Sequence, residues 1–185
     1  MAKIDVDASL APRLFAPRLT VLVTSLDKKG RANIITLSWV MPTSFDPPLV
    51  AISVGRQRYS HELIEGCREF VVNLPSQDIL EKVQVCGSRS GRNVDKFAES
   101  GLTQLPSKKV KPPRIKECVA HLECRLVDSL RTGDHTIFIG EVLAASVDEE
   151  VFDKMEKGIR LEAFKPVLHL TGPYFTTSAS VRRIG

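Results

Sequence analysis

The 185-residue sequence has no apolar run that approaches the roughly 18–20 residues a membrane-spanning helix needs. Its start, MAKIDVDASLAPRLF, also lacks the long apolar core and the small-residue cleavage site of a secretory signal. We therefore expect a cytoplasmic protein with no membrane partner.

Cysteine is scarce, and no two of Cys67, Cys86, Cys118 and Cys124 are spaced as C-x-x-C. A cytoplasmic chain keeps such thiols reduced, so we expect buried small hydrophobic residues and not disulfides. Cys118, His121 and Cys124 have the residue types of metal ligands. In a strand, however, His121 faces away from both cysteines, and we expect no metal site.

The sequence also lacks the dinucleotide, Walker, hydrolase and zinc-protease motifs G-x-G-x-x-G, G-x-x-x-x-G-K-[ST], G-x-S-x-G and H-E-x-x-H. Aromatic residues make up only 6% of the chain, and the basic residues behind its net charge of +4 are scattered. A nucleic-acid surface needs basic residues clustered on one face, so we expect none, whereas an anionic ligand suits the charge. If the protein does chemistry, a bound cofactor supplies it.

β-Branched and apolar runs predict about seven strands, at residues 19–26, 31–39, 49–55, 69–74, 118–129, 136–147 and 167–171. Short helices are predicted at 60–65, 77–85 and 94–100, a partly helical segment at 149–164, and loops at 42–48 and 102–116. The turn at Gly133-Asp134 predicts the longest hairpin of the molecule. Because strands and helices do not alternate regularly, we expect one mostly β domain, 1–185, built as an antiparallel barrel with helical insertions.

Polar side chains occur inside two of these strands, at Asn33, Thr36, Ser38 and Ser53. They suit a ligand that lies along the strand, and the alternative is a strand with one solvated face. Alternation places Asn33 opposite to Thr36 and Ser38. A single ligand meets Asn33 and Trp39 as well as Thr36 and Ser38 only if the strand bulges or ends before Thr36, so we predict an irregularity between Asn33 and Trp39.

Three further segments carry residue types that bind an anion or exchange a proton. Ser60, two residues after Arg58, is predicted to cap a helix start. This segment is either a phosphate-binding site or an ordinary helix cap beside solvated arginines. The Gly-rich loop before Lys96 offers a second helix start and a cation, or simply another capped helix. His135, in the hairpin turn, is either a hydrogen-bond donor or acid for a ligand, or a histidine with no functional role.

In their order, NIITLSW, DPPLVAISVG, RYS, EFVVNL, CGSRSGRNVDKF and GDHTIFIGEV resemble the flavin reductase-like FMN-binding family, most closely its flavoredoxin branch. The resemblance implies a split β-barrel and a homodimer with non-covalent FMN, or FAD, near the subunit interface. It also implies no certain catalytic residue, flavin tuning by Lys96, His135 and Trp39, and flavin contacts at Asn33, Thr36, Leu37, Ser38, Trp39, Ser53, Val54, Gly55, Arg58, Ser60, Ser90, Gly91, Lys96, His135 and Phe175.

Three functions follow as hypotheses. The first is a flavoprotein oxidoreductase of the flavoredoxin type, which exchanges electrons with a protein donor or acceptor. The second is a flavin or ferric reductase with exchangeable flavin that uses NADPH or NADH as substrate. The third is a small-barrel binding module without enzymatic activity.

Overall fold

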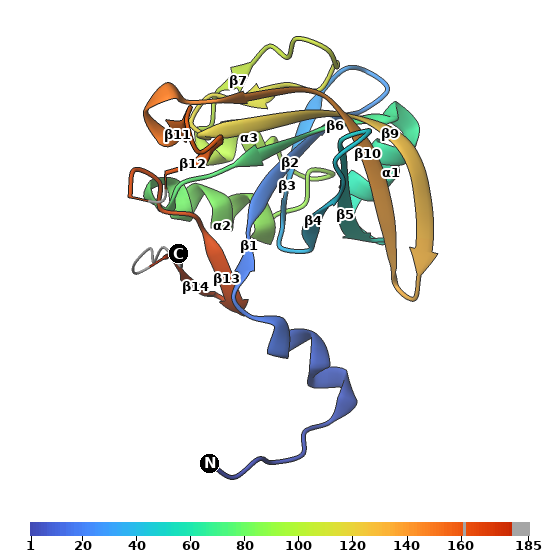
Figure 1. Ribbon diagram of the computed structural model, residues 1–185. Helices are drawn as coiled ribbons and strands as arrows, with labels where there is room; N and C mark the ends of the chain where they lie inside the picture. Colours follow the sequence, from blue (N-terminus) through green and yellow to red (C-terminus); the bar gives the residue numbers. More distant parts are fainter. Residues whose placement is uncertain (161, 179–185) are drawn as a thin grey trace.

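The computed structural model of the protein describes residues 1–160 and 162–178 (Figure 1). Within these residues, the main sheet has seven strands in the order β3-β2-β6-β9-β10-β5-β4, and all neighbours are antiparallel. Their bounds are β2 Val21–Leu26, β3 Ala32–Leu37, β4 Val40–Ser44, β5 Leu49–Gly55, β6 Glu69–Leu74, β9 Ala120–Thr132 and β10 His135–Val147. The predicted mostly β, antiparallel architecture is confirmed.

A second sheet joins the two ends of the chain. It consists of β1 Arg18–Leu19, β13 Leu168–Thr171 and β14 Tyr174–Thr176 in the order β1-β13-β14. Two small hairpins pair β7 Gln104–Leu105 with β8 Arg114–Ile115 and β11 Phe152–Asp153 with β12 Gly158–Ile159. The helices are α1 Tyr59–Cys67, α2 Leu80–Ser88 and α3 Lys96–Ser100, with 3-10 turns η1 Ala8–Phe15, η2 Gln77–Ile79 and η3 Glu149–Val151.

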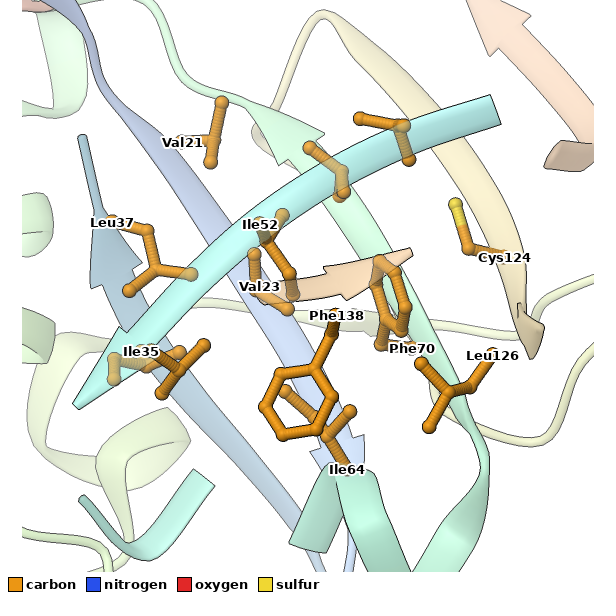
Figure 2. Close-up of a cluster of buried hydrophobic side chains, with 13 residues drawn as sticks. Val21, Val23, Ile35, Leu37, Ile52, Ile64, Phe70, Cys124, Leu126 and Phe138 are labelled. Atoms are coloured by element: carbon orange, nitrogen blue, oxygen red, sulfur yellow. The ribbon is translucent and has the colours of Figure 1, made fainter. Parts of the chain in front are cut away.

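The barrel encloses the main hydrophobic core. Side chains from several strands point toward one another there, among them Ile52, Phe70 and Phe138, each 0% exposed (Figure 2). A second cluster packs Leu22 and Ile34 from the sheet against residues of α2 and α3. β3 is therefore covered on both faces, and α2 and α3 lie beside it.

The cysteines fit the prediction of small buried residues. Cys86, Cys118 and Cys124 are buried, Cys67 is half-buried, and all four are free thiols. Burial raises the pKa of Cys118 and Cys124 far above the ordinary thiol value, because the thiolate loses its hydration. His121 bonds to the carbonyl of Ile115 at 2.8 Å, and no cluster that could hold a metal ion occurs in residues 1–160 and 162–178.

Several predicted elements were wrong in kind or extent. Pro42 lies within β4 and not in a loop, because β4 is an edge strand that pairs only with β5 and needs no donor on its outer side. The segment 149–164, predicted to be partly helical, contains the 3-10 turn η3, and the hairpin of β11 and β12 follows it. In the predicted surface loop at 102–116, Leu102 and Ile115 are buried. The backbone N–H groups of Lys108 and Lys109 in this loop donate to the buried carboxylate of Glu123.

The predicted hairpin is confirmed and is the longest in the described chain. β9 and β10 have 13 residues each, and Gly133, with φ +55, forms the turn that needs a left-handed residue. In the same part of the chain, residues 1–160 and 162–178, no helix is both long and apolar enough for a membrane span.

Candidate flavin site

A cleft of about 430 Å³ opens where the barrel wall is incomplete. β3 and β4 are the two edges of the main sheet, and the chain passes from one to the other through Ser38 and Trp39. The backbone N–H of Ser53 donates to the carbonyl of Trp39 at 2.9 Å and ties β5 to this crossing. The cleft therefore runs along the outer edge of β3, where side chains from both faces of the strand can border it.

This position explains how Asn33 and Trp39 share one cleft with Thr36 and Ser38. The ladder between β3 and β2 is regular along the whole of β3, so the strand neither bulges nor ends before Thr36. It is interrupted at Ser38 instead. The predicted irregularity is present at the end of the segment, but the strand edge, and not a bulge, brings these residues together.

Asn33 is the most constrained polar group in the cleft. It is 5% exposed, and its Nδ2 donates to Ser60 Oγ at 2.7 Å. Its Oδ1 is buried and has no hydrogen-bond partner among the described residues. A Cβ on Gly91 would lie 1.9 Å from this oxygen, so only glycine lets the loop approach so closely. A buried acceptor without a donor is costly, and a ligand with N–H or O–H donors satisfies it.

Lys96 places a cation in the wall of the cleft. It is 5% exposed, and its Nζ donates to the carbonyls of Ile34 at 2.8 Å and Cys86 at 2.7 Å. Burial lowers the pKa of this ammonium to about 8, because desolvation disfavours the charged form. An ammonium has three N–H donors, so a third remains for an acceptor on a ligand.

The cleft also contains a stacked aromatic pair. The rings of Trp39 and His135 stack with centroids 4.7 Å apart and an interplanar angle of 30°. His135 Nδ1 lies 2.6 Å from Asp134 Oδ1, and this contact lowers the pKa of the Asp134 carboxyl. The stack offers a planar surface, and the second ring nitrogen of His135 is left for a hydrogen bond to a ligand.

The cleft also borders the residues at the start of α1. The helix begins at Tyr59 with Arg58 as its N-cap residue, and no side chain caps it. The prediction that Ser60 caps the helix was wrong, since Ser60 lies in the first turn and its hydroxyl instead accepts from Asn33. The first-turn N–H groups and the Arg58 guanidinium suit an anion beside the start of α1.

The structure brings most of the predicted site residues into one lining. The predicted residues that line the cleft are Asn33, Thr36, Leu37, Ser38, Trp39, Ser53, Gly55, Arg58, Ser60, Ser90, Gly91, Lys96 and His135. Val54 does not line it, because alternation along β5 turns its side chain into the core. Phe175 does not line it either, but its ring contacts His169, which does, with centroids 5.1 Å apart.

Sequence reasoning did not assign eight lining residues to the site: Arg18, Ile35, Gln57, Tyr59, Gly87, Ser88, Arg89 and His169. Arg18 and His169 meet through the pairing of β1 with β13, with 3.2 Å between Arg18 Nη2 and His169 Nδ1. No local signal identifies such a long-range pair. Tyr59 and Arg89 are neighbours of predicted residues, so a wider window around those motifs finds them.

The family described as flavin reductase like domain matches residues 14–178. The chain belongs to this family. An uncharacterized protein of Archaeoglobus fulgidus is 41% identical over 170 residues, which cover 91% of this chain and 92% of that protein. The structure is similar to a flavoredoxin of Methanosarcina acetivorans, with a TM-score of 0.87, 30% identity and coverage of 100% of this chain and 95% of that one.

The flavoredoxin of Desulfovibrio vulgaris (Miyazaki F) is a second similar structure. Its TM-score is 0.87 at 26% identity, over 100% of this chain and 97% of that one. The flavin reductase-like split β-barrel predicted from the sequence is therefore confirmed as the fold and family of this chain. The roles of the individual residues as flavin ligands stay predictions.

Proposed function

We propose that the protein is a flavin-dependent oxidoreductase that holds FMN non-covalently in the cleft along β3. The observation that carries the proposal is that two buried polar groups in this cleft have unused hydrogen-bonding capacity. Asn33 Oδ1 is a buried acceptor that needs a donor, and Lys96 is a buried cation with an unused N–H. A flavin offers ring N–H and ribityl O–H donors as well as ring carbonyl acceptors, so it satisfies both.

In this proposal, Arg58 and the first turn of α1 bind the phosphate, because they present positive charge and free N–H groups. Lys96, Trp39 and His135 contact the ring system and fix its orientation. When bound, the flavin supplies the hydride or electron transfer. The residues of the chain supply binding, orientation and a positive charge at Lys96.

The physiological role follows one of two courses. Two similar structures are named flavoredoxins, and this supports electron exchange with a protein donor or acceptor. Alternatively, NADPH or NADH reduces the flavin directly. Stopped-flow mixing of the FMN-loaded protein with each nucleotide distinguishes them: rapid bleaching identifies a nucleotide-dependent reductase, and an unchanged spectrum identifies a carrier.

We predict that Arg58→Ala weakens FMN binding by about 1.5–3 kcal/mol, because it removes a charge-assisted contact to the phosphate. Ser60→Ala is expected to weaken it less, by about 1 kcal/mol, through loss of the hydrogen bond that holds Asn33. Titration of the apoprotein with FMN, followed by flavin fluorescence, measures both effects. Arg56→Ala is the matched control, since Arg56 lies two residues away but does not line the cleft. Unchanged affinity in Arg58→Ala and Ser60→Ala would place the phosphate elsewhere.

We also propose that two copies of the chain associate beside the cleft. The N-terminal segment projects from the body of the protein, and η1 buries none of its residues (Figure 1). An apolar groove of about 550 Å³ lies between η1 and the barrel wall, and Phe15 and Met41, both in its lining, are 76% and 56% exposed. The groove shares Arg18, Ser38, Trp39 and Ser53 with the cleft, so a second copy there would cover the cleft beside Trp39.

Light scattering on a size-exclusion column tests this association. We expect the mass of two chains for the wild type and of one chain for Met41→Asp, because burial of a carboxylate in an apolar interface is costly. Lys154→Asp is a control of the same kind on an exposed side chain outside the groove. A one-chain mass for the wild type over the concentration range tested would contradict the proposal.

A further inference from the structure

Arg18 lies where the cleft meets the apolar groove beside η1. It is half-buried and lines both cavities, as do Ser38, Trp39 and Ser53. Its strand, β1, pairs with β13 at the point where the N-terminal segment leaves the body of the protein (Figure 1). A molecule that enters the cleft beside Trp39 therefore meets the side chain of Arg18.

The contacts of Arg18 leave its positive charge uncompensated. Its Nη1 donates to the carbonyl of Pro12 at 2.5 Å, and its Nη2 lies 3.4 Å from the carbonyl oxygen of Leu170 and 3.2 Å from His169 Nδ1. His169 Nε2 donates to the carbonyl of Gly172 at 3.1 Å, so Nδ1 is left to accept from Arg18 and the ring is neutral. All three partners of the guanidinium are therefore uncharged, and among the described residues no Asp or Glu lines either cavity.

The guanidinium also has unused donors. It carries five N–H groups, and its three contacts leave two of them without an acceptor. One of these is on Nε, which is buried and has no hydrogen-bond partner among the described residues. A buried N–H without an acceptor is costly. A carboxylate supplies both the acceptor and the negative charge, so the partner that Arg18 lacks is an anion.

The surroundings of Arg18 indicate the rest of this anion. The phosphate of the flavin lies beside Arg58 in the proposed function, so the anion at Arg18 is a different group. On the groove side the neighbours are apolar, among them Val40 and Ile137. The ring of Trp39, in both linings, is 42% exposed. An apolar wall and an open aromatic ring suit a planar hydrocarbon group, so the ligand is a small planar molecule with one carboxylate.

We propose that Arg18 is a specificity-determining residue, which binds the carboxylate of a small planar acid admitted to the cleft beside the flavin ring. The inference rests on the proposed flavin site and gives the chemical class of the second ligand of that site. A carboxylate on Arg18 holds the planar group against Trp39, which contacts the flavin ring in the proposed function. The rest of the groove, with Phe15 and Met41, remains for the second copy of the chain.

To test this, the FMN-loaded protein is titrated with benzoate and with benzamide, which has the same ring and a similar shape but no charge. Calorimetry measures each affinity, and a change in flavin absorption reports a ligand beside the ring. We expect the wild type to bind benzoate about tenfold or more tightly than benzamide, the size of one charge-assisted contact. Arg18→Gln should bring this ratio close to one, because glutamine keeps a donor but not the charge. Arg13→Gln is the matched control, since Arg13 lies in η1 and lines neither cavity, and it should keep the wild-type ratio.

A ratio near one in the wild type, or a ratio that Arg18→Gln leaves unchanged, overturns the proposal. So does a preference for benzoate without any change in flavin absorption, because the ligand then lies away from the ring. If circular dichroism shows that Arg18→Gln does not fold, Arg18→Lys takes its place. With the charge kept, this variant should still bind benzoate more tightly than benzamide, and equal affinities overturn the proposal. FMN binding without a preference for benzoate overturns this inference alone, whereas a protein that binds no FMN overturns the proposed function and the inference together.

Discussion

Gly91→Ala is expected to weaken FMN binding by about 2–3 kcal/mol while the protein stays folded. The added Cβ would lie 1.9 Å from Asn33 Oδ1 and 2.8 Å from Asn33 Cγ, so the asparagine must leave its position. Asn33 is buried and held by Ser60, and its displacement breaks that bond and removes the acceptor from the cleft. FMN titration together with circular dichroism measures the two parts of the prediction.

Two further variants make this result specific. Gly66→Ala is the control, because a Cβ there meets nothing within 4 Å and a helical alanine is favourable. Asn33→Ala in the Gly91→Ala background removes the collision. We expect the double variant to bind FMN no worse than Asn33→Ala alone, since the two changes act on one contact. Equal affinity of Gly91→Ala and the wild type would show that Asn33 does not bind the flavin.

Lys96→Met is expected to lower the free energy of unfolding by about 2–4 kcal/mol, because it leaves two buried carbonyls without their donor. These carbonyls, of Ile34 in β3 and Cys86 in α2, are linked to α3 through this one ammonium. Lys82→Met is the matched control, since it removes a single exposed bond to Gly101 and should cost less than about 1 kcal/mol. Urea unfolding of both variants measures the difference, and equal losses would contradict the role given to Lys96.

The same measurement has a pH dependence with a defined sign. The pKa of Lys96 is lowered from 10.5 to about 8 in the folded protein. Between these values the unfolded chain binds the extra proton, so the contribution of Lys96 to stability grows as the pH rises. We therefore expect a larger difference between the wild type and Lys96→Met at about pH 9.5 than at about pH 7.5. A constant difference would mean that the lysine keeps its ordinary pKa.

Local patterns predicted the strands well. β5 and β6 begin and end where their apolar runs predict, and the turn at Gly133 fixes the β9–β10 hairpin. Each of these elements depends on residues that are neighbours in sequence. The sheet order does not, because it joins β2 to β6 and β5 to β10 through contacts that no local pattern encodes.

The sequence predicted the lining residues that are polar side chains inside strands. It missed those that reach the cleft only through pairing between distant segments of the chain. Polar residues inside β3 and β5, and the loop before α3, are part of the cleft lining as the sequence predicted. Arg18 and His169 reach the cleft only through the pairing of the two ends of the chain. Ser60 shows the limit of a capping rule, because its hydroxyl bonds to Asn33 and not to the helix start. A tertiary partner outweighed the local preference.

The most direct test of the account is a titration of the purified apoprotein with FMN, read by flavin absorption and fluorescence. We predict saturable binding of one FMN per chain, release of unmodified FMN on denaturation, and weaker binding in Arg58→Ala and Gly91→Ala but not in Gly66→Ala. A colourless protein that binds neither FMN nor FAD would contradict the central claim that the cleft along β3 is a flavin site.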